Sequence, residues 1–163
     1  MSKIAFSEKR LDEIVDKYKD LVYRVAFART RDKDDADDIF QEVFLRYVRK
    51  QPDFESVEHE KAWFIRVTIN CCKTLWERLK RVNFEEFDEN VAEVEEESCE
   101  ILEELLDKLP PDYRVVIHLF YYEDISTADI SKILMRNEST VRMQLTRARR
   151  MLKEFMKGDE VNV

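Results

Sequence analysis

The stretch DISTADISKILMRNESTVRMQLTRARRMLKEFMK, residues 124–157, decides how the second half of this 163-residue chain folds. Ser126 followed three residues later by Asp129 forms a capping box in which Asp replaces the usual Glu. We therefore expect a short helix over 127–134. The polar residues at 135–138 predict a turn rather than a continuation of that helix.

A second and longer helix follows the turn, with Ser139 as its N-cap and its end near Met156. At about 100° per residue, its apolar and basic side chains fall on separate, neighbouring faces. The apolar face holds Val141, Leu145, Ala148, Leu152 and Phe155, and the basic face holds Arg142, Thr146, Arg149, Arg150 and Lys153, with Met143 and Arg147 at its edge. A short helix, a turn and a longer capped helix with a basic face form the helix-turn-helix pattern, which binds DNA in the major groove. We prefer this interpretation to a solvated basic helix.

The rest of the chain is also predicted to be helical, because apolar residues recur along it at three-four spacing. The chain has one glycine and three prolines, which argues against hairpin-rich sheets and low-complexity fibres. The expected helices lie at about 7–28, 34–50, 60–81, 101–109 and 112–122, with Pro110 and Pro111 ending the fourth. The predicted fold class is all-α.

The acidic charge of the chain is concentrated in one segment. Residues 85–107 hold 12 acidic residues and no basic one, although the formal net charge of the whole chain is only −8. Residues 1–84 hold 18 Lys and Arg against 16 Asp and Glu, and residues 108–163 hold 10 against 8. Like charges extend a chain, so we expect two small helical domains, 1–84 and 99–163, joined by an acidic linker at 85–98. The linker is either a solvating spacer or an acidic strand that lies in a basic groove of a partner.

The outer face of the predicted helix 34–50 combines acids, an amide and an isolated leucine. Its members are Asp38, Gln41, Glu42, Leu45 and Arg49. Such a face is either ordinary surface or a docking patch with an apolar centre and a polar rim. The residues alone favour ordinary surface.

The outer face of the predicted helix 60–81 places a tryptophan among cations and amides. It holds Trp63, Arg66, Asn70, Lys73, Thr74, Lys80 and Arg81, whereas the buried stripe holds Ala62, Ile65, Ile69, Cys72, Trp76 and Leu79. The tryptophan is either half-buried at a domain seam or a stacking platform for unpaired bases, with the cations binding phosphates. Phe54 and Phe64 are either core residues or an extension of that platform.

Other classes of function have little support in the sequence. The N-terminus lacks an apolar signal core, so we expect a cytoplasmic protein. The three cysteines fit free thiols, and with only two histidines we expect no zinc or other metal site. No nucleophile and base are paired, so we expect no catalytic residues, no cofactor and no small-molecule substrate. A metal-dependent hydrolase built on the acids at 34–38 is a remote alternative.

Several motifs resemble those of one protein family. Residues 35–46, DADDIFQEVFLR, resemble the second conserved region of bacterial sigma factors, and residues 62–67 with Asn70 resemble its promoter-melting part. Five stretches of this chain resemble the fourth region: Leu109 and Pro110, Tyr113 and Arg114, residues 125–134, residues 140–142 and residues 147–149. The chain has no space for regions one and three of the larger sigma factors, so it is similar to the small extracytoplasmic-function group.

This resemblance implies partners and binding residues. Core RNA polymerase, through its β and β′ subunits, would bind Asp38, Gln41, Glu42, Leu45 and Arg49. The promoter −10 element, with one base flipped from the non-template strand, would bind Phe54, Lys61, Trp63, Arg66, Asn70 and Lys73. The −35 element would bind Ser139, Thr140, Arg142, Met143, Thr146, Arg147, Arg149 and Arg150. The resemblance further implies a linker near the RNA exit path, a monomer when free, and inhibition by an anti-sigma factor.

Two departures from the family pattern lie in the helix-turn-helix. The family has glycine in the turn where this chain has Met135 and Arg136. A left-handed residue would be strained there without glycine, so we expect a repacked turn. Gln144 stands where a basic residue is usual, and Met143 is likewise unusual, so we expect an altered −35 sequence.

Two rival classes of protein stay open at this point. One is a conventional DNA-binding regulator with a helical sensor domain, which a stable dimer and a palindromic operator would favour. The other is a helical interaction module that regulates polymerase without touching DNA.

Overall fold

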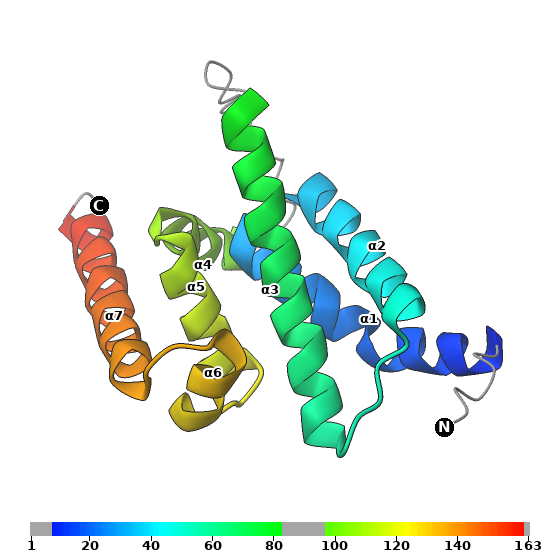
Figure 1. Cartoon of the computed structure of the whole chain (residues 1–163). Coiled ribbons are helices and arrows are strands. Elements are labelled where there is room, and N and C mark those ends of the chain that lie inside the picture. Colours follow the sequence, from blue (N-terminus) through cyan, green and yellow to red (C-terminus); the bar gives the residue numbers. More distant parts are fainter. Residues whose placement is uncertain (1–7, 83–96, 162–163) are drawn as a thin grey trace. The chain divides into compact units, whose positions relative to one another are not determined.

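A computed structural model of the protein describes residues 8–82 and 97–161. Every regular element of these residues is helical (Figure 1): α1 (Glu8–Thr30), α2 (Lys33–Lys50), α3 (Val57–Val82), α4 (Glu97–Lys108), α5 (Pro111–Ile117), the π-helix η1 (His118–Tyr122), α6 (Thr127–Leu134) and α7 (Glu138–Val161). The chain divides into two units, Met1–Val82 and Asn83–Val163. The all-α class with two helical domains is confirmed. The predicted linker at 85–98 lies mostly outside the described residues, and its last two positions already belong to α4.

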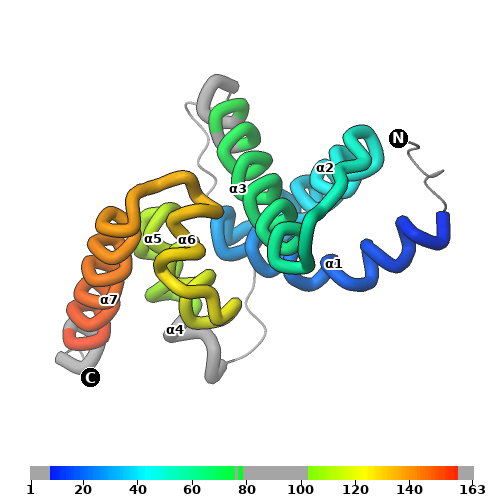
Figure 2. Tube along the Cα trace, turned by 60° about the horizontal axis from the view of Figure 1, so that its bottom comes forward, coloured from blue at the N-terminus to red at the C-terminus, as the bar shows by residue number. Residues whose placement is uncertain are grey.

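Unit 1 is a bundle of α1, α2 and α3, in which each helix packs against the other two (Figure 2). α2 begins after Asp32, whose carboxylate accepts a hydrogen bond from the backbone N–H of Asp35 at 2.9 Å. The predicted apolar stripes form the core, which includes Leu21, Val22, Val25, Ile39, Val43, Ile65 and Ile69. Two predicted members of the α3 stripe, Trp76 and Leu79, lie outside the described side chains.

In unit 2, α4, α5 and α6 all pack against α7. The regular helix predicted at 112–122 is wrong over its second half, because α5 ends at Ile117 and continues as η1. The backbone N–H of Glu123 donates to the carbonyl of His118 at 3.1 Å, which is the wider hydrogen-bond pattern of a π-helix. The core of the unit consists of Leu105, Leu109, Val115, Val116, Leu119, Ile130, Val141, Leu145 and Ala148, among others.

The N-cap of α6 that the capping-box pattern predicted is present. α6 begins after Ser126, whose Oγ accepts a hydrogen bond from the backbone N–H of Asp129 at 3.1 Å. The helix spans the predicted residues, Thr127–Leu134. α7 begins at Glu138, so the prediction of Ser139 as its N-cap is wrong and Ser139 lies within its first turn. The helix extends to Val161 and therefore beyond its predicted end near Met156.

The turn between α6 and α7 keeps a left-handed residue without glycine. Met135 has φ 56° and ψ 47°, and the next backbone N–H, of Arg136, donates to the carbonyl of Ser131 at 2.9 Å. This is the hydrogen bond that closes a Schellman-type helix end. The expectation of a repacked turn is wrong, because the backbone holds the left-handed conformation and Met135 bears the steric cost of its Cβ there.

Replacing Met135 by glycine should stabilise unit 2. Glycine adopts a positive φ without a Cβ clash, so Met135→Gly is expected to raise the free energy of unfolding by about 1 kcal/mol. Native-state hydrogen exchange of the α6 and α7 amides measures the change. The control is Met143→Gly, at an exposed methionine within α7, which should lower the free energy of unfolding by about 1 kcal/mol. Equal destabilisation by both substitutions would contradict the left-handed turn.

Candidate nucleic-acid interface

The side of α7 that faces away from the core of unit 2 carries most of the residues predicted to bind DNA. Val141, Leu145 and Ala148 are buried, so the solvent-facing side chains lie on the opposite side of the helix. The exposed residues are Ser139, Arg142, Met143, Thr146, Arg147, Arg149 and Arg150, whereas Thr140 is half-buried. We call this set the α7 basic face. Its guanidinium groups are suited to phosphates and to base edges.

Two arginines of the α7 basic face have partners within unit 2. Arg142 Nη2 lies 3.3 Å from Glu138 Oε1, and the same oxygen accepts a hydrogen bond from Thr127 Oγ1 at 3.1 Å. Arg149 Nε donates to the hydroxyl of Tyr121 at 2.6 Å, and its guanidinium lies 5.4 Å from the centre of that ring. Ion pairs between exposed side chains are weak, so DNA can compete with Glu138 for Arg142.

Gln144 lies on the buried side of α7 and not on its basic face. The residue is 9% exposed, and its Oε1 accepts a hydrogen bond from Arg136 Nη1 at 3.0 Å. A cation at position 144 would lie beside the Arg136 guanidinium and would repel it. The neighbouring arginine therefore explains why an amide, rather than a basic residue, occupies this position.

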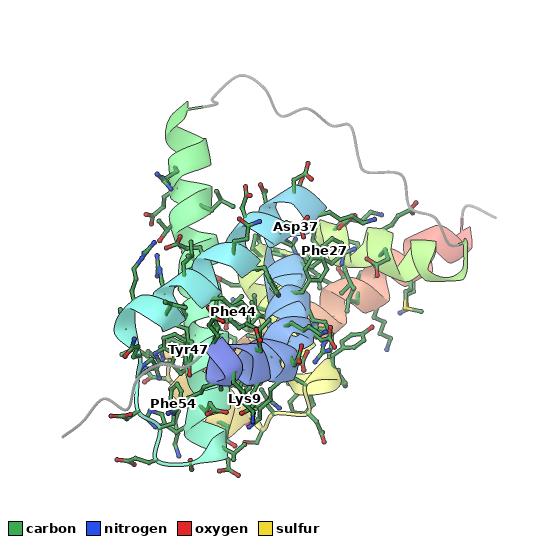
Figure 3. All side chains as sticks on the ribbon, turned by 90° about the vertical axis from the view of Figure 1, so that its right-hand side faces the viewer. Lys9, Phe27, Asp37, Phe44, Tyr47 and Phe54 are labelled. Atoms are coloured by element: carbon green, nitrogen blue, oxygen red, sulfur yellow. The ribbon has the colours of Figure 1, made fainter. Side chains whose placement is uncertain are left out.

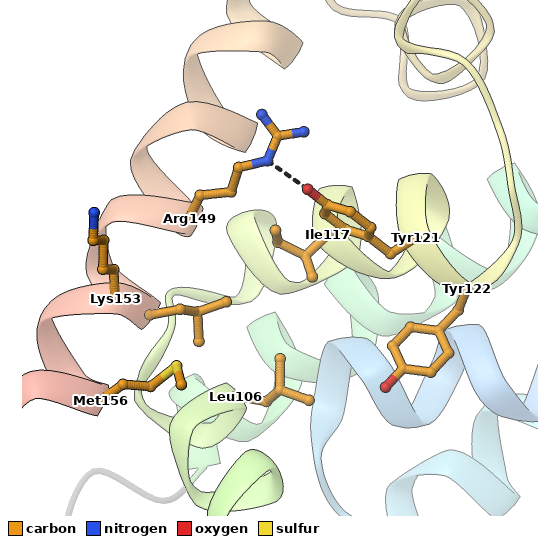
Figure 4. A pocket seen from close by; sticks show the side chains of 8 residues that line it. Leu106, Ile117, Tyr121, Tyr122, Arg149, Lys153 and Met156 are labelled. Carbon is orange, nitrogen blue, oxygen red and sulfur yellow. Dashed lines mark hydrogen bonds between the residues drawn. The ribbon is translucent and has the colours of Figure 1, made fainter. Parts of the chain in front are cut away.

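An apolar groove of about 430 Å³ lies in unit 2 and was not predicted from the sequence (Figure 4). Its lining residues are Leu106, Ile117, Tyr121, Tyr122, Arg149, Leu152, Lys153 and Met156. Tyr121 and Tyr122 are 55% and 60% exposed, and both belong to η1. Two adjacent tyrosines were the feature of the sequence that could have indicated this groove. The π-helix in which both of them are exposed was not predicted.

In unit 1, Trp63 belongs to an aromatic cluster. Its ring lies 5.9 Å from Phe54, 6.0 Å from Tyr47 and 4.9 Å from Phe64, measured between ring centres. Tyr47 lies near the end of α2, and Phe54 lies in the loop that follows it (Figure 3). Trp63 and Phe54 are half-buried, whereas Phe64 is fully buried. Phe64 is therefore a core residue, and Phe54 is the phenylalanine that reaches the surface beside Trp63.

The other residues predicted to bind the −10 element continue from Trp63 along α3. Arg66 and Asn70 are exposed and Lys73 is half-buried. Residues at 63, 66, 70 and 73 follow three-four spacing and lie along one side of the helix. We call them, together with Phe54, the α3 strip. Lys61 is half-buried, and at two residues before Trp63 it points to a different side of α3.

The predicted outer face of α2 is solvent-accessible. Leu45 is 49% exposed, and Asp38, Gln41 and Arg49 are also exposed. Glu42 Oε1 forms ion pairs with Arg46 Nε at 3.2 Å and with Arg49 Nη1 at 3.5 Å. Leu45 is thus an exposed apolar side chain within a rim of charged and amide groups.

No metal centre emerges from the part of the chain that the structure describes, since no three His, Cys, Asp or Glu side chains there could hold an ion together. The helices of that part are too short or too polar to span a membrane.

Burial and the neighbouring carboxylates of Asp32, Asp38 and Asp34 raise the pKa of Asp35. Cys71 and Cys72 are buried free thiols.

Two family models match the chain. The model of sigma-70 region 2 matches residues 14–82, and that of sigma-70 region 4 matches residues 99–152. The ECF RNA polymerase sigma factor SigE of Mycolicibacterium smegmatis is 29% identical over 89% of this chain, which spans 61% of that relative. The RNA polymerase sigma factor SigV of Bacillus subtilis is 27% identical over 94% of this chain and 95% of its own length.

Solved structures share the fold. The sigma factor RpoE, solved in complex with the anti-sigma factor NepR from Bartonella quintana, has a TM-score of 0.73 at 22% identity and covers 91% of this chain and 98% of its own. CnrH, solved in complex with the cytosolic domain of CnrY, has a TM-score of 0.70 at 20% identity and covers 95% of this chain and 92% of its own. At these identities the likeness concerns the fold.

The buried thiol of Cys72 should make unit 1 sensitive to alkaline pH. Burial raises its pKa from 9.0 to about 12. The stabilisation from the neutral thiol is complete below about pH 9 and is lost as the pH rises towards 12, because the unfolded thiol ionises first. Cys72→Ala should therefore flatten the decline in unfolding free energy over this interval. Urea unfolding followed by tryptophan fluorescence measures unit 1, which contains both tryptophans; identical pH profiles for the two proteins would contradict the expectation.

Proposed function

Because the chain belongs to the extracytoplasmic-function group of the sigma-70 family, we propose that it directs core RNA polymerase to promoters, recognises their −10 and −35 elements and promotes strand opening. The observation that carries the proposal is the order of the two family regions, each matched within a separate helical unit. The protein makes and breaks no covalent bond itself. It acts in the cytoplasm, without a cofactor or a small-molecule substrate.

Unit 2 provides the −35 contacts through the α7 basic face. The first residues of the second helix in a helix-turn-helix approach base edges, and later cations hold phosphates. We assign base contacts to Ser139, Thr140, Arg142 and Met143, and backbone contacts to Thr146, Arg147, Arg149 and Arg150. The hydroxyl of Tyr121 occupies only Nε of Arg149, so the terminal nitrogens of that guanidinium are the donors for a phosphate.

Unit 1 provides the −10 contacts through the α3 strip. The half-buried rings of Phe54 and Trp63 give an unpaired base an aromatic surface on which to stack. Arg66 and Lys73 supply positive charge for the backbone, and the amide of Asn70 supplies a donor and an acceptor for a base edge. Lys61 lies on a different side of α3 and is not part of this surface. Stacking of a flipped base stabilises the open strand, which is how this surface favours melting.

The outer face of α2 is the proposed docking surface for core polymerase. Leu45 is the apolar centre, and Asp38, Gln41, Glu42 and Arg49 form the polar rim. Glu42 lies 3.5 Å from Arg49 in an exposed and therefore weak ion pair, so polymerase can displace it on docking.

Polymerase is required for tight promoter binding in this proposal. Non-specific affinity for DNA grows with the number of phosphates neutralised, and the two basic segments of the chain carry only a small excess of positive charge. When polymerase binds both units, the contact of one unit with DNA makes the contact of the other intramolecular. Each unit therefore raises the effective concentration of the other at its promoter element. Equally tight promoter binding by the free, monomeric chain at physiological salt would contradict this part of the proposal.

An anti-sigma factor is a further proposed partner. The similar RpoE was solved in complex with the anti-sigma factor NepR. A protein that covered the α2 outer face or the α7 basic face of this chain would block polymerase or DNA, and would hold the protein inactive.

Two substitutions should separate promoter recognition from strand opening. Trp63→Ala removes a stacking surface and is expected to lower strand opening about tenfold with little loss of promoter binding. Arg142→Ala removes a base contact and is expected to weaken promoter binding about tenfold. Holoenzyme made with purified core polymerase is tested on the promoter of its own operon, by gel shift for binding, permanganate reactivity for opening and run-off transcription for output. If the unsubstituted protein yields no promoter-specific transcript, the proposed function is wrong.

Leu45→Ala should weaken binding to core polymerase. Truncating the centre of a docking patch commonly costs about 2 kcal/mol, so we expect affinity to fall about thirtyfold. The matched control is Val57→Ala, at another exposed aliphatic residue of unit 1 that the proposal places outside the patch. Fluorescence titration of labelled chain with core polymerase measures both variants. Equal affinities for the two variants would exclude this face of α2 as the docking surface.

A further inference from the structure

The side chain of Arg136 links three segments of unit 2. Its Nη1 donates to Gln144 Oε1 on α7 at 3.0 Å, and its Nη2 donates to Asp112 Oδ1 in the first turn of α5 at 3.2 Å. The side chain is 17% exposed, so its guanidinium lies among these partners rather than in open solvent. Hydrogen bonds that involve a charged group are shorter and stronger than those between neutral groups.

Arg136 also completes the turn in which no glycine is present. It directly follows the left-handed Met135, and its backbone N–H closes the end of α6 on the carbonyl of Ser131. Arg136 therefore anchors the backbone of the turn through its N–H and links α5 to α7 through its side chain. This arrangement compensates for the unfavourable backbone conformation of Met135.

Gln144 belongs to the same helix as the α7 basic face, so a contact that holds Gln144 also bears on the direction of that face. Side-chain directions on a helix are related by about 100° per residue. Holding Gln144 against Arg136 therefore fixes how α7 is rotated about its own axis, and with it the directions of Arg142 and Met143. A rotation of α7 would turn both side chains away from the −35 element together.

We propose that Arg136 is a positioning residue for −35 recognition. It touches no DNA, and through Gln144 and Asp112 it fixes the rotation of α7 against α5. Gln144 is then an internal acceptor rather than a residue that contacts a base. The inference rests on the proposed function, because it concerns how the α7 basic face is oriented on the −35 element.

The test measures −35 preference in assembled holoenzyme. Core polymerase carrying the full chain selects from a duplex promoter library that is randomised across the −35 element and constant at the −10 element, and the bound sequences are counted. Arg136→Ala should lower the preference for the best −35 sequence about three- to tenfold. Gln144→Glu keeps an acceptor for Arg136 and should retain the preference within about twofold.

The dependence of binding on salt separates positioning from phosphate contact. On one duplex with the preferred −35 sequence, Arg150→Ala should reduce the slope of log affinity against log salt by about 1, because it loses a phosphate contact. Arg136→Ala should leave the slope unchanged while lowering affinity. Hydrogen exchange of α6 and α7 establishes whether unit 2 of each variant is folded. If Arg136→Ala unfolds unit 2, the −35 preference of Gln144→Glu decides whether the positioning role stands.

Arg142→Ala is the reference for the proposed function. If the unsubstituted protein and Arg142→Ala have the same −35 preference, the α7 basic face itself is misassigned and both proposals fail. If Arg142→Ala loses preference and a folded Arg136→Ala does not, only the positioning role is overturned. The positioning role is also overturned if Gln144→Glu loses as much −35 preference as Arg142→Ala, or if Arg136→Ala reduces the slope of log affinity against log salt.

Discussion

Packing around the ring of Phe64 is the interaction on which unit 1 depends. Phe64 is fully buried, and rings from all three helices and from the loop after α2 surround it: Tyr18, Phe44, Tyr47, Phe54 and Trp63. Aromatic pairs favour offset-stacked or edge-to-face geometries, which restrict the orientation of each ring; here Tyr18 stacks on Phe64, and Trp63 meets it edge to face. Phe54 and Trp63, whose rings are proposed to stack on DNA, are therefore held by the same cluster that holds the helices together.

Sequence patterns predicted the parts of the fold that depend on short-range physics. Three-four spacing located the helices of unit 1, because a helix with one apolar stripe must bury it. Ser126 and Asp129 located the start of α6, because a cap is a local hydrogen bond. The exposed side of α7 followed from helical geometry and the positions of its apolar residues alone. The residues of the α3 strip and the outer face of α2 were found in the same way, with their roles supplied by the family resemblance.

The features that were missed depend on contacts between segments distant in the chain. Gln144 was expected to alter the −35 sequence, but it is buried and accepts a hydrogen bond from Arg136, which is bound in turn to Asp112, far earlier in the sequence. The same network accompanies the left-handed Met135, which local propensity alone would reject. Phe64 was ambiguous between core and platform, since helical spacing does not reveal which neighbouring helices will cover a ring.

The π-helix η1 gives unit 2 a tolerance to changes in chain length. A π-helical segment holds about one residue more per turn than an α-helix. Loss of one residue between 118 and 122 can therefore be absorbed by tightening η1 into an α-helical turn, which leaves the segment that follows in place relative to α5. The same deletion inside α6 would instead rotate every later side chain of that helix by about 100°. Homologues that differ in length by a single residue can thus retain one DNA-facing geometry when the indel falls in this segment.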